Sequence, residues 1–380
     1  MKKKRIVFML FSLSLLLMTG CWDSIELNDQ AIVLGIGADL TEDGNYQLSA
    51  QVVLPSSMGS SESGGGQGKQ FYVATEKGAT YYEAFENLQA KISRRLNRGQ
   101  KQSVYIGERL AEHGIRDIID SFTRDPDARV MGDISVVKGH QALDALKISD
   151  PLESASALAS LKIHEQKDIA ANTRLLDFLV VNARESMSPS PPALGLEQDQ
   201  NALKSVGSAI LNKNLKLVGF LNEGETKDKM WVLGNLSYQD ITASIPQGKG
   251  KINLRTTNLK SKIQPMINPY KAKFKITLTG EGEVRLNNTN FDLTKPDKVE
   301  IMEHELEKYF EKRVSQLIKK VQKEYKTDIF GFGDAIFRKD PSQWKKIKNE
   351  WGKEFSEADI SVKVDLTIHL IGMTGTSEQH

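Results

Sequence analysis

The sequence predicts an α+β protein with more than one domain, and two observations support this class. Between residues 80 and 138, segments with helical spacing of apolar residues alternate with short apolar runs, as in an α/β layer. Beyond residue 205, short strand-like segments joined by polar turns indicate an antiparallel sheet, followed by one long amphipathic helix. We expect an N-terminal α/β-layered domain over residues 21–185, formed as one unit or as two subdomains, and a C-terminal antiparallel sheet packed against the long helix over residues 203–374.

The first twenty residues are typical of a bacterial lipoprotein signal peptide. A cationic segment at residues 2–5 precedes an apolar run at residues 6–18, and Met-Thr-Gly-Cys follows, ending at Cys21, the only cysteine. The apolar run of about 13 residues is shorter than the roughly 20 that a spanning helix needs. We therefore expect cleavage before Cys21 and a lipid on its sulfur. An ordinary secretory signal that happens to end near a cysteine is the alternative, and Met18 departs from the leucine usual in a lipobox.

The charge of the mature chain argues against a nucleic-acid-binding protein. The full sequence has 51 Lys and Arg against 49 Asp and Glu, and the signal peptide contains four of the basic residues and no acidic one. Removing it leaves 47 basic against 49 acidic residues, a net charge near −2, without the bulk positive charge that nucleic-acid binding favours. Hydrophobic residues make up 39% of the chain, enough for sizeable cores. With Cys21 acylated, no thiol remains for a disulfide.

The mature chain is expected to start with strands at residues 30–39 and 46–54. The first of them contains Gly35 and Gly37, which are not accompanied by the third glycine of a dinucleotide fingerprint or by the Gly-Lys-Ser/Thr of a P-loop. They favour a strand that bends or packs closely against another element. Residues 55–70 are rich in Ser and Gly and cannot bury enough apolar area to offset their ordering entropy, so we expect a mobile loop there.

A helix is predicted from Thr80, which forms a capping box with Glu83, to the glycine at 99. Its apolar residues recur at helical spacing: Tyr81, Phe85, Leu88, Ile92 and Leu96. The elements expected after it are a strand at 102–107, a helix at 109–122, a strand at 130–138, and helices at 154–163 and 173–182. Residues 186–202 are Pro-rich and then polar, and we expect them to form an extended, poorly packed linker between the domains.

The second half is predicted to contain strands at 205–211, 215–221, 229–233 and 271–286. The long helix is expected to start with a capping box formed by Asp297 and Glu300. Its apolar stripe has spacings of three and four residues: Met302, Leu306, Phe310, Val314, Leu317, Val321 and Tyr325. Strict alternation over residues 360–370 predicts a final half-buried strand.

A basic run precedes the long helix. No acidic residue lies between Asp240 and Glu281, whereas eight basic residues do. Alternation should place Lys271, Lys273 and Lys275 on one face of a strand, where they could contact anionic lipid or an acidic partner. A solvated lysine face that only keeps the sheet soluble is the alternative.

The sequence contains no recognisable catalytic or metal-binding constellation. His164-Glu165 lacks the second histidine of a zinc-binding HExxH helix, and there is no Gly-x-Ser-x-Gly elbow or free thiol nucleophile. We therefore expect no enzyme activity, no cofactor and no metal, and direct binding of a small molecule is not expected because no convergent polar pocket is visible.

The chain resembles the Ger(x)C family, the C-subunit lipoproteins of nutrient germinant receptors in endospore-forming bacteria. The first set of residues behind the resemblance is Gly20-Cys21-Trp22-Asp23, Glu26-Leu27-Asn28, residues 31–37, Arg94-Arg95-Leu96 and Arg124-Asp125-Pro126. The second set is Val206-Gly207, Leu217-Val218-Gly219, residues 328–333, Pro341, Trp344, Trp351 and the closing strand to Gly372. The resemblance thus covers the mature chain.

The resemblance implies a protein on the outer face of the cell membrane, which is the inner membrane of the spore. Cys21 would bear an S-diacylglycerol and an N-linked acyl chain such as palmitate, and Trp22 and Asp23 beside it would be candidates for interaction. The partners implied are the integral-membrane A and B subunits and the bilayer itself, with no cofactor. A solute-binding lipoprotein of a transporter is the rival hypothesis, but such proteins consist of two α/β lobes, which the second half does not resemble.

Overall fold

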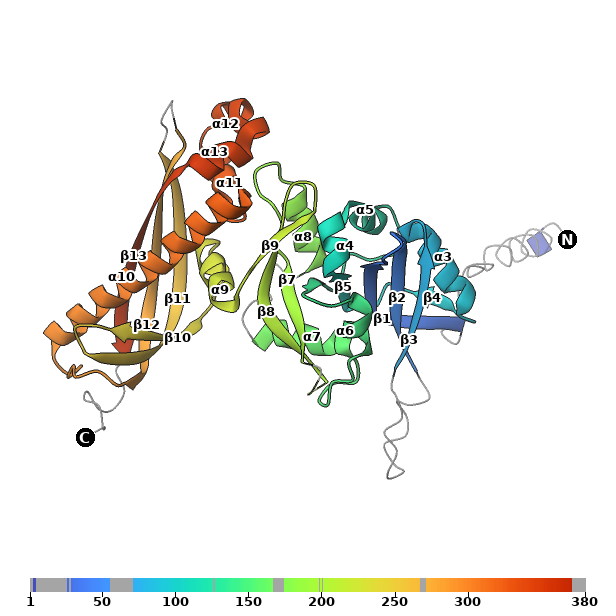
Figure 1. Cartoon of the computed structure of the whole chain (residues 1–380), viewed down its shortest axis with the longest axis horizontal. Helices are drawn as coiled ribbons and strands as arrows, with labels where there is room; N and C mark the ends of the chain where they lie inside the picture. The colour runs from blue at the N-terminus through green and yellow to red at the C-terminus, as the bar shows by residue number, and fades with distance from the viewer. Residues whose placement is uncertain are drawn as a thin grey trace, which may run out of the picture.

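The computed structural model describes residues 3–4, 26, 29–54, 71–125, 127–166, 174–197, 199, 201–266 and 271–370. The predictions for Cys21, Trp22, Asp23 and the loop at 55–70 lie outside these residues. Figure 1 shows an N-terminal domain and a C-terminal domain side by side along the long axis of the molecule. The α+β class, with a large N-terminal sheet and a C-terminal sheet against a long helix, is confirmed.

The N-terminal domain is built on a nine-stranded mixed sheet with the order β3-β2-β1-β5-β6-β7-β8-β9, while β4 pairs with the start of β1. The central strands β1, β5, β6 and β7 run parallel, and both flanks are antiparallel. The strands are β1 (Gln30–Leu40), β2 (Tyr46–Val53), β3 (Phe71–Gly78), β4 (Arg95–Asn97), β5 (Ser103–Gly107), β6 (Asp133–Val137), β7 (Pro192–Glu197), β8 (Ala202–Leu211) and β9 (Leu217–Leu221). One continuous sheet means that the described part of this domain is not split into two subdomains.

Helices cover both faces of this sheet. One hydrophobic cluster joins the sheet to four helices: α3 (Tyr81–Lys91), α4 (Glu108–His113), α5 (Arg116–Arg124) and α8 (Leu175–Asn182). On the other face lie α6 (Ala142–Lys147) and α7 (Ser156–Gln166). A Cβ atom added at Gly35 or Gly37 would lie 2.8 or 2.9 Å from the Leu146 side chain of α6. The expected close packing at these glycines of β1 is therefore confirmed.

The C-terminal domain contains a four-stranded sheet with the order β10-β11-β12-β13. Its strands are β10 (Gln239–Ile245), β11 (Gly250–Met266), β12 (Lys273–Asn287) and β13 (Asp359–Leu370). The prediction of a purely antiparallel sheet is wrong, because β13 pairs with β12 in parallel. A parallel pair needs a long crossover, and here α10 (Pro296–Lys320), α11 (Phe332–Lys339), α12 (Pro341–Ile347) and α13 (Trp351–Glu357) supply it.

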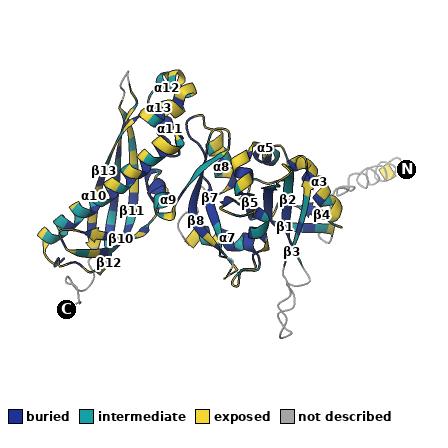
Figure 2. Cartoon of the chain, in the orientation of Figure 1, coloured by how far each residue is buried: buried dark blue, intermediate teal, exposed yellow. Residues whose placement is uncertain are grey.

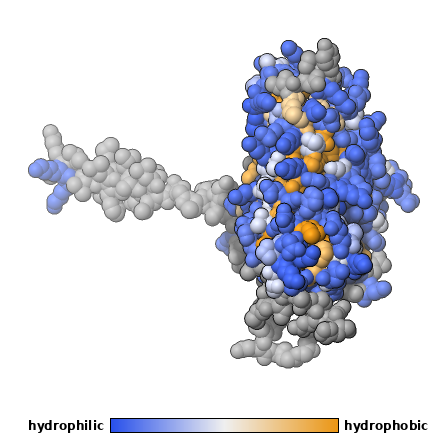
Figure 3. Space-filling view, turned by 90° about the vertical axis from the view of Figure 1, so that its left-hand side faces the viewer, coloured by the Kyte–Doolittle hydropathy of each residue, from blue (hydrophilic) through white to orange (hydrophobic). Residues whose placement is uncertain are grey.

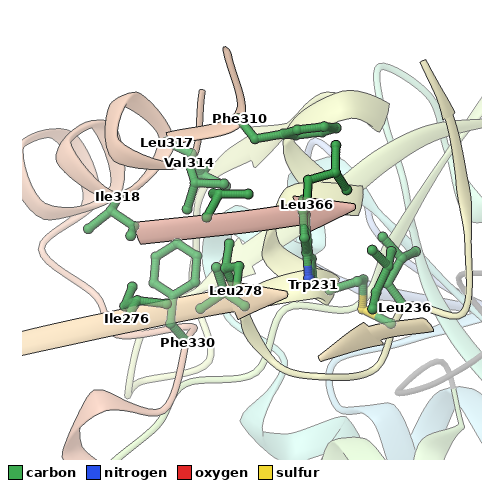
Figure 4. Packing of buried hydrophobic residues seen from close by; sticks show 14 of the residues in the cluster. Trp231, Leu236, Ile276, Leu278, Phe310, Val314, Leu317, Ile318, Phe330 and Leu366 are labelled. Atoms are coloured by element: carbon green, nitrogen blue, oxygen red, sulfur yellow. The ribbon is translucent and has the colours of Figure 1, made fainter. Parts of the chain in front are cut away.

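The core of this domain lies between the sheet and α10. The predicted stripe is buried at Met302, Leu306, Phe310, Val314 and Leu317, and the inward residues Ile276, Leu278 and Leu366 of β12 and β13 belong to the same cluster (Figure 4). Figure 2 shows the same pattern over the described residues of both domains, with buried residues on the inner faces and exposed ones outside. α10 begins at Pro296, so Asp297 lies in its first turn, and the predicted capping box is absent.

Three glutamates of α10 close the free edge of β13. The carboxylates of Glu303, Glu307 and Glu311 accept hydrogen bonds from the backbone N–H groups of Ile368, Leu366 and Val364, at 2.7, 3.2 and 3.1 Å. Successive glutamates are four residues apart on the helix and successive N–H donors two residues apart on the strand. We call this arrangement the glutamate ladder. It satisfies edge donors that would otherwise be open to pairing with another strand.

Two predicted helices in the first half have different bounds in the structure. Thr80 caps α3 as expected, with its side chain accepting from Glu83 N at 3.1 Å, but the helix ends at Lys91. The residues that continued its periodicity form β4, where Leu96 pairs with Ala31 of β1. The helix expected at 109–122 is divided into α4 and α5 at Gly114.

Two predictions around the domain boundary are wrong. Residues 229–233 are not a strand but the end of α9 (Glu223–Val232), which begins with a capping box between Asn222 and Glu225. The expected linker is not poorly packed, because residues 186–189 are buried and Pro192–Glu197 forms β7 within the sheet. Proline is tolerated at the first residue of β7, where a missing N–H costs least.

Candidate functional site

Helix α9 connects the two domains through two neighbouring buried charges. The Lys229 ammonium donates to Ser190 O, Ser190 Oγ and Ser208 Oγ in the N-terminal domain, each at 3.2 Å, and burial lowers its pKa to about 7. The Asp228 carboxylate lies on the other side and accepts from the Arg313 guanidinium of α10 at 2.9 and 3.1 Å. Burial raises the pKa of Asp228 to about 6 although Arg313 acts in the opposite direction. Through these two side chains, α9 holds the domains in one relative position.

A second connection is formed by the turn that contains Asp328. The buried Asp328 carboxylate accepts from the backbone N–H groups of Phe330, Gly331 and Gly333, each at 2.9 Å, and from Trp351 Nε1 at 3.2 Å. Its backbone oxygen accepts from Ser188 N at 2.8 Å. At the end of the turn, Asp334 binds the Ser186 hydroxyl and the Arg184 guanidinium. The turn therefore fixes the chain that enters β7 against the C-terminal domain.

A cavity of about 430 Å³ lies beside this connection, between α8 and α11. Its rim includes the Arg184–Asp334 ion pair, at 2.8 Å. Apolar side chains on the same two helices are half exposed: Leu176 is 50% exposed, Val180 46% and Phe337 50%. Such residues are candidates for contact with another protein, although nothing in the described chain specifies its chemistry.

The three lysines singled out in the sequence lie on the open face of the C-terminal sheet. Lys271 precedes β12, Lys273 and Lys275 lie within it, and all three are exposed, while Phe274 and Ile276 point into the core as expected. Lys273 forms an ion pair with Asp359 of the neighbouring strand β13 at 3.2 Å. Asp359 is far from Lys273 in the sequence, so the sequence alone did not reveal this acidic partner. Figure 3 shows this end of the molecule with hydrophilic side chains flanking a narrow apolar band.

The position of these lysines favours the solubility interpretation over contact with lipid. They belong to the domain opposite the N-terminal end of the molecule (Figure 1), where the expected anchor would be attached. We expect the triple variant K271E/K273E/K275E to stay folded, with each exposed change costing no more than about 0.5 kcal/mol. Its binding to anionic vesicles at low salt should match that of K345E/K346E/K353E, which makes the same charge change at exposed residues of α12 and α13. A salt-dependent loss in the first variant alone would restore the lipid interpretation.

The described residues contain no group of three or more His, Cys, Asp or Glu side chains placed to hold a metal ion. His164 is fully buried, and its Nδ1 lies 2.9 Å from Asp133 Oδ2. Among the described helices, none combines the length and apolar character needed to cross a bilayer.

The sequence-based predictions missed the residues of the domain junction. The strand predicted at residues 229–233 starts at Lys229 and leaves Asp228 outside it, although the Asn-x-x-Glu pattern at 222–225 is a helix-start signature that identifies α9. Asp328 was recognised only as part of a motif. Its role as an acceptor for four donors depends on where the chain places Trp351, which no local pattern reveals.

Comparison with known proteins identifies two consecutive family segments. Residues 23–195 match the family model described as "Spore germination protein N-terminal domain", and residues 206–372 match "Spore germination B3/ GerAC like, C-terminal". The gap between the two matches falls at the β7–β8 hairpin, so the second segment supplies the last two strands of the N-terminal sheet.

Full-length relatives agree with these segments. Spore germination protein KC of Bacillus subtilis (strain 168) is 29% identical over all of this chain and 99% of its own length. Spore germination protein B3 of the same organism is 26% identical, covering 95% of this chain and 96% of its own. A solved structure titled "Crystal Structure of the GerBC protein" shares the fold, with a TM-score of 0.57 and 23% identity over 88% of this chain and 96% of that one. The chain therefore belongs to the Ger(x)C family of germinant receptor C subunits.

Proposed function

We propose that this protein is a lipid-anchored, non-enzymatic subunit of a nutrient germinant receptor that is required for spore germination. It acts by assembling with the integral-membrane A and B subunits. The observation that carries the proposal is the end-to-end match to spore germination protein KC, which is 29% identical over all of this chain and 99% of its own length. The family is one of receptor subunits and not a known enzyme family.

The anchor in this proposal is Cys21, acylated on its sulfur and on its amino group. An extended chain spans about 3.3–3.6 Å per residue, so the nine residues from Cys21 to Gln30 hold the start of β1 within about 30 Å of the bilayer. Trp22 and Asp23 would then lie next to the outer face of the membrane. In this arrangement the N-terminal domain lies nearest the integral-membrane subunits.

Replacement of the anchor gives a direct test. We expect Cys21→Ala to leave an uncleaved precursor without acyl chains and to lower germination. The acyl chains on Cys21 together supply the stable membrane attachment, which a single chain would not give, and the variant loses all of them. The measurements are incorporation of a labelled fatty acid and membrane fractionation. Met18→Leu, which introduces the usual lipobox residue, serves as the control and should be processed like the parent. Labelled fatty acid in the Cys21→Ala variant would refute the anchor.

The receptor assignment itself is tested by deleting the gene and assaying spore germination across nutrients. Loss of the response to one nutrient class, restored by the intact chain, is the expected result. A strain that germinates normally but fails to import a solute would instead support the solute-binding lipoprotein. The fold argues against that rival, since the second half is a mixed sheet against one long helix and not a second α/β lobe.

A further inference from the structure

A cavity of about 1020 Å³ lies in the N-terminal domain, between α3 and α5 and above β4. No convergent polar pocket is visible in the sequence, whereas the fold brings polar and aromatic side chains together around this cavity. The cavity is at the upper end of the 300–1,000 Å³ range typical of small-molecule sites. It is separate from the domain junction, because all its lining residues lie between Tyr46 and Asp127.

Aromatic and acidic side chains alternate on the walls of this cavity. On α3, Tyr82, Phe85 and Glu86 are spaced so that they share one helix face. On α5, Asp117 belongs to the face turned toward the cavity, and its carboxylate accepts a hydrogen bond from the Tyr46 hydroxyl at 3.0 Å. Tyr82 is 70% exposed, so its ring is accessible to a molecule that enters the cavity.

The arginines of the cavity all have acidic partners, although the buried Arg98 Nε donates no hydrogen bond to a described residue. Each of its three arginines forms an ion pair with its own aspartate. The pairs are Arg95–Asp127 at 3.0 Å, Arg124–Asp120 at 2.6 Å, and Arg98–Asp125. Arg98 also stacks over the Phe85 ring, 4.0 Å from its centroid. Among the lining residues, Glu86 and Asp117 are the carboxylates without an ion-pair partner, so the cavity has a net charge of −2.

A buried hydroxyl adds a polar group that lacks a partner. Tyr81 lines the cavity and is 6% exposed, and its oxygen makes no hydrogen bond to a described residue. The neighbouring Ser121 donates its own proton to Ile118 O at 2.7 Å. Burial raises the pKa of the Tyr81 phenol, which therefore stays neutral. Its oxygen can accept a hydrogen bond from a donor on a ligand. A buried polar atom left unpaired is costly unless a ligand or water supplies the partner.

We propose that this cavity binds an organic cation, an ammonium or guanidinium group carried on an aromatic or aliphatic body. The Glu86 and Asp117 carboxylates would accept its N–H groups, the Tyr82 ring would contribute a cation–π contact, and the apolar walls would hold the body. The same chemistry is found in a free amine and in the lysine or arginine side chain of a partner. The proposal does not depend on receptor assembly or on the anchor.

The test uses the full chain in detergent micelles and three probes with one common ring: phenethylamine, phenylacetate and 2-phenylethanol. Calorimetry should show saturable binding of phenethylamine below about 10 mM, and at least about tenfold weaker binding of the other two. A capped peptide, acetyl-Gly-Lys-Gly-amide, separates the sources, because tighter binding of the peptide points to a partner side chain and tighter binding of phenethylamine to a free amine.

Matched variants keep the test independent of folding. The double variant E86Q/D117N should weaken phenethylamine binding by at least about tenfold, whereas E42Q/D43N, which removes two exposed carboxylates elsewhere, should bind like the parent. Tyr82→Ala should weaken binding about threefold or more, while Tyr72→Ala, which removes a half-exposed ring outside the cavity, should not. Equal binding of phenylacetate, no binding of either amine up to about 10 mM, or unchanged affinity in folded E86Q/D117N would each overturn the proposal.

Discussion

Asp328→Ala is expected to destabilise the protein by about 4 kcal/mol or more. The substitution leaves four buried donors without an acceptor: the N–H groups of Phe330, Gly331 and Gly333 and the indole of Trp351. Each unpaired buried donor costs about 1–3 kcal/mol, and because the four share one acceptor the costs do not simply add. The same turn holds Ser188, so loosening it also frees the chain that enters β7. Urea unfolding of the purified chain measures the loss.

Asp340→Ala provides the matched control for this variant. Asp340 also accepts backbone N–H groups, those of Ser342 and Gln343 at 3.0 Å, but it is a partly exposed cap of α12. Loss of such a cap typically costs about 1 kcal/mol. If the two alanine variants lost equal stability, the burial of Asp328 would not be the source of its importance.

The ionisation of Asp328 gives this prediction a pH dependence. Burial raises its pKa to about 6 from an ordinary value of 3.8, so between about pH 4 and pH 6 the folded protein keeps a proton that the unfolded chain has released. The carboxyl therefore makes the free energy of unfolding fall as pH rises through this window, and its contribution is constant above it. Asp328→Asn cannot titrate, so its deficit relative to the parent should be larger at pH 5 than at pH 7. An equal deficit at both pH values would contradict the raised pKa.

Gly207→Ala is expected to be the second severe substitution, costing about 3 kcal/mol or more. Gly207 in β8 has φ +117°, and a Cβ atom there would lie 1.9 Å from Leu221 O and 2.7 Å from Asn222 C. Both contacts are with backbone, at the end of β9 and the cap of α9, so the junction helix would have to move. Overpacking of this kind costs about 1–3 kcal/mol in addition to the backbone strain of about 1–2 kcal/mol.

Gly139→Ala separates the two causes, because Gly139 has φ +76° but nothing lies within 4 Å of an added Cβ. It should lose only the strain energy, about 1–2 kcal/mol. Thermal unfolding of both variants, compared with the parent, gives the difference. A Gly207→Ala variant no less stable than Gly139→Ala would mean that β8 and α9 can separate at little cost.

The sequence predicts best those elements that have one buried face and one exposed face. α10 and β13 each have one buried and one exposed face, so their periods of 3.6 and 2 appear in the sequence and both were predicted. β7 fails this condition, because it pairs with β6 and β8 and shows no alternation of buried and exposed residues, while Pro192 and the prolines before it suggest a linker. α9 fails for a related reason. Residues 228–232 are all buried between the two domains, so the apolar residues do not recur at helical spacing on one face.

The candidate sites were harder to predict, because each depends on contacts between residues far apart in the sequence. The ion pair of Lys273 needs Asp359, and the cavity between α3 and α5 needs three aspartates that neutralise three arginines. The sequence contains these charged residues but does not reveal which of them form ion pairs. The shared exposed face of Lys271, Lys273 and Lys275 was predictable, since strict alternation in a strand fixes which side chains lie on the same face.

The glutamate ladder can contain only a few glutamates, because the rise of the helix and the rise of the strand do not match. Four residues of helix advance about 6.0 Å, whereas two residues of strand advance about 6.6 Å, so the two scales drift apart by about 0.6 Å at every step. Glu303, Glu307 and Glu311 span two steps and accumulate about 1.2 Å, which flexible glutamate side chains can absorb. The next positions in the series, 299 and 315, are Val and Ser, so the sequence supplies no fourth rung in either direction. An insertion of one residue in β13 would turn its N–H groups away from α10, so natural variation in chain length is expected to spare this pairing.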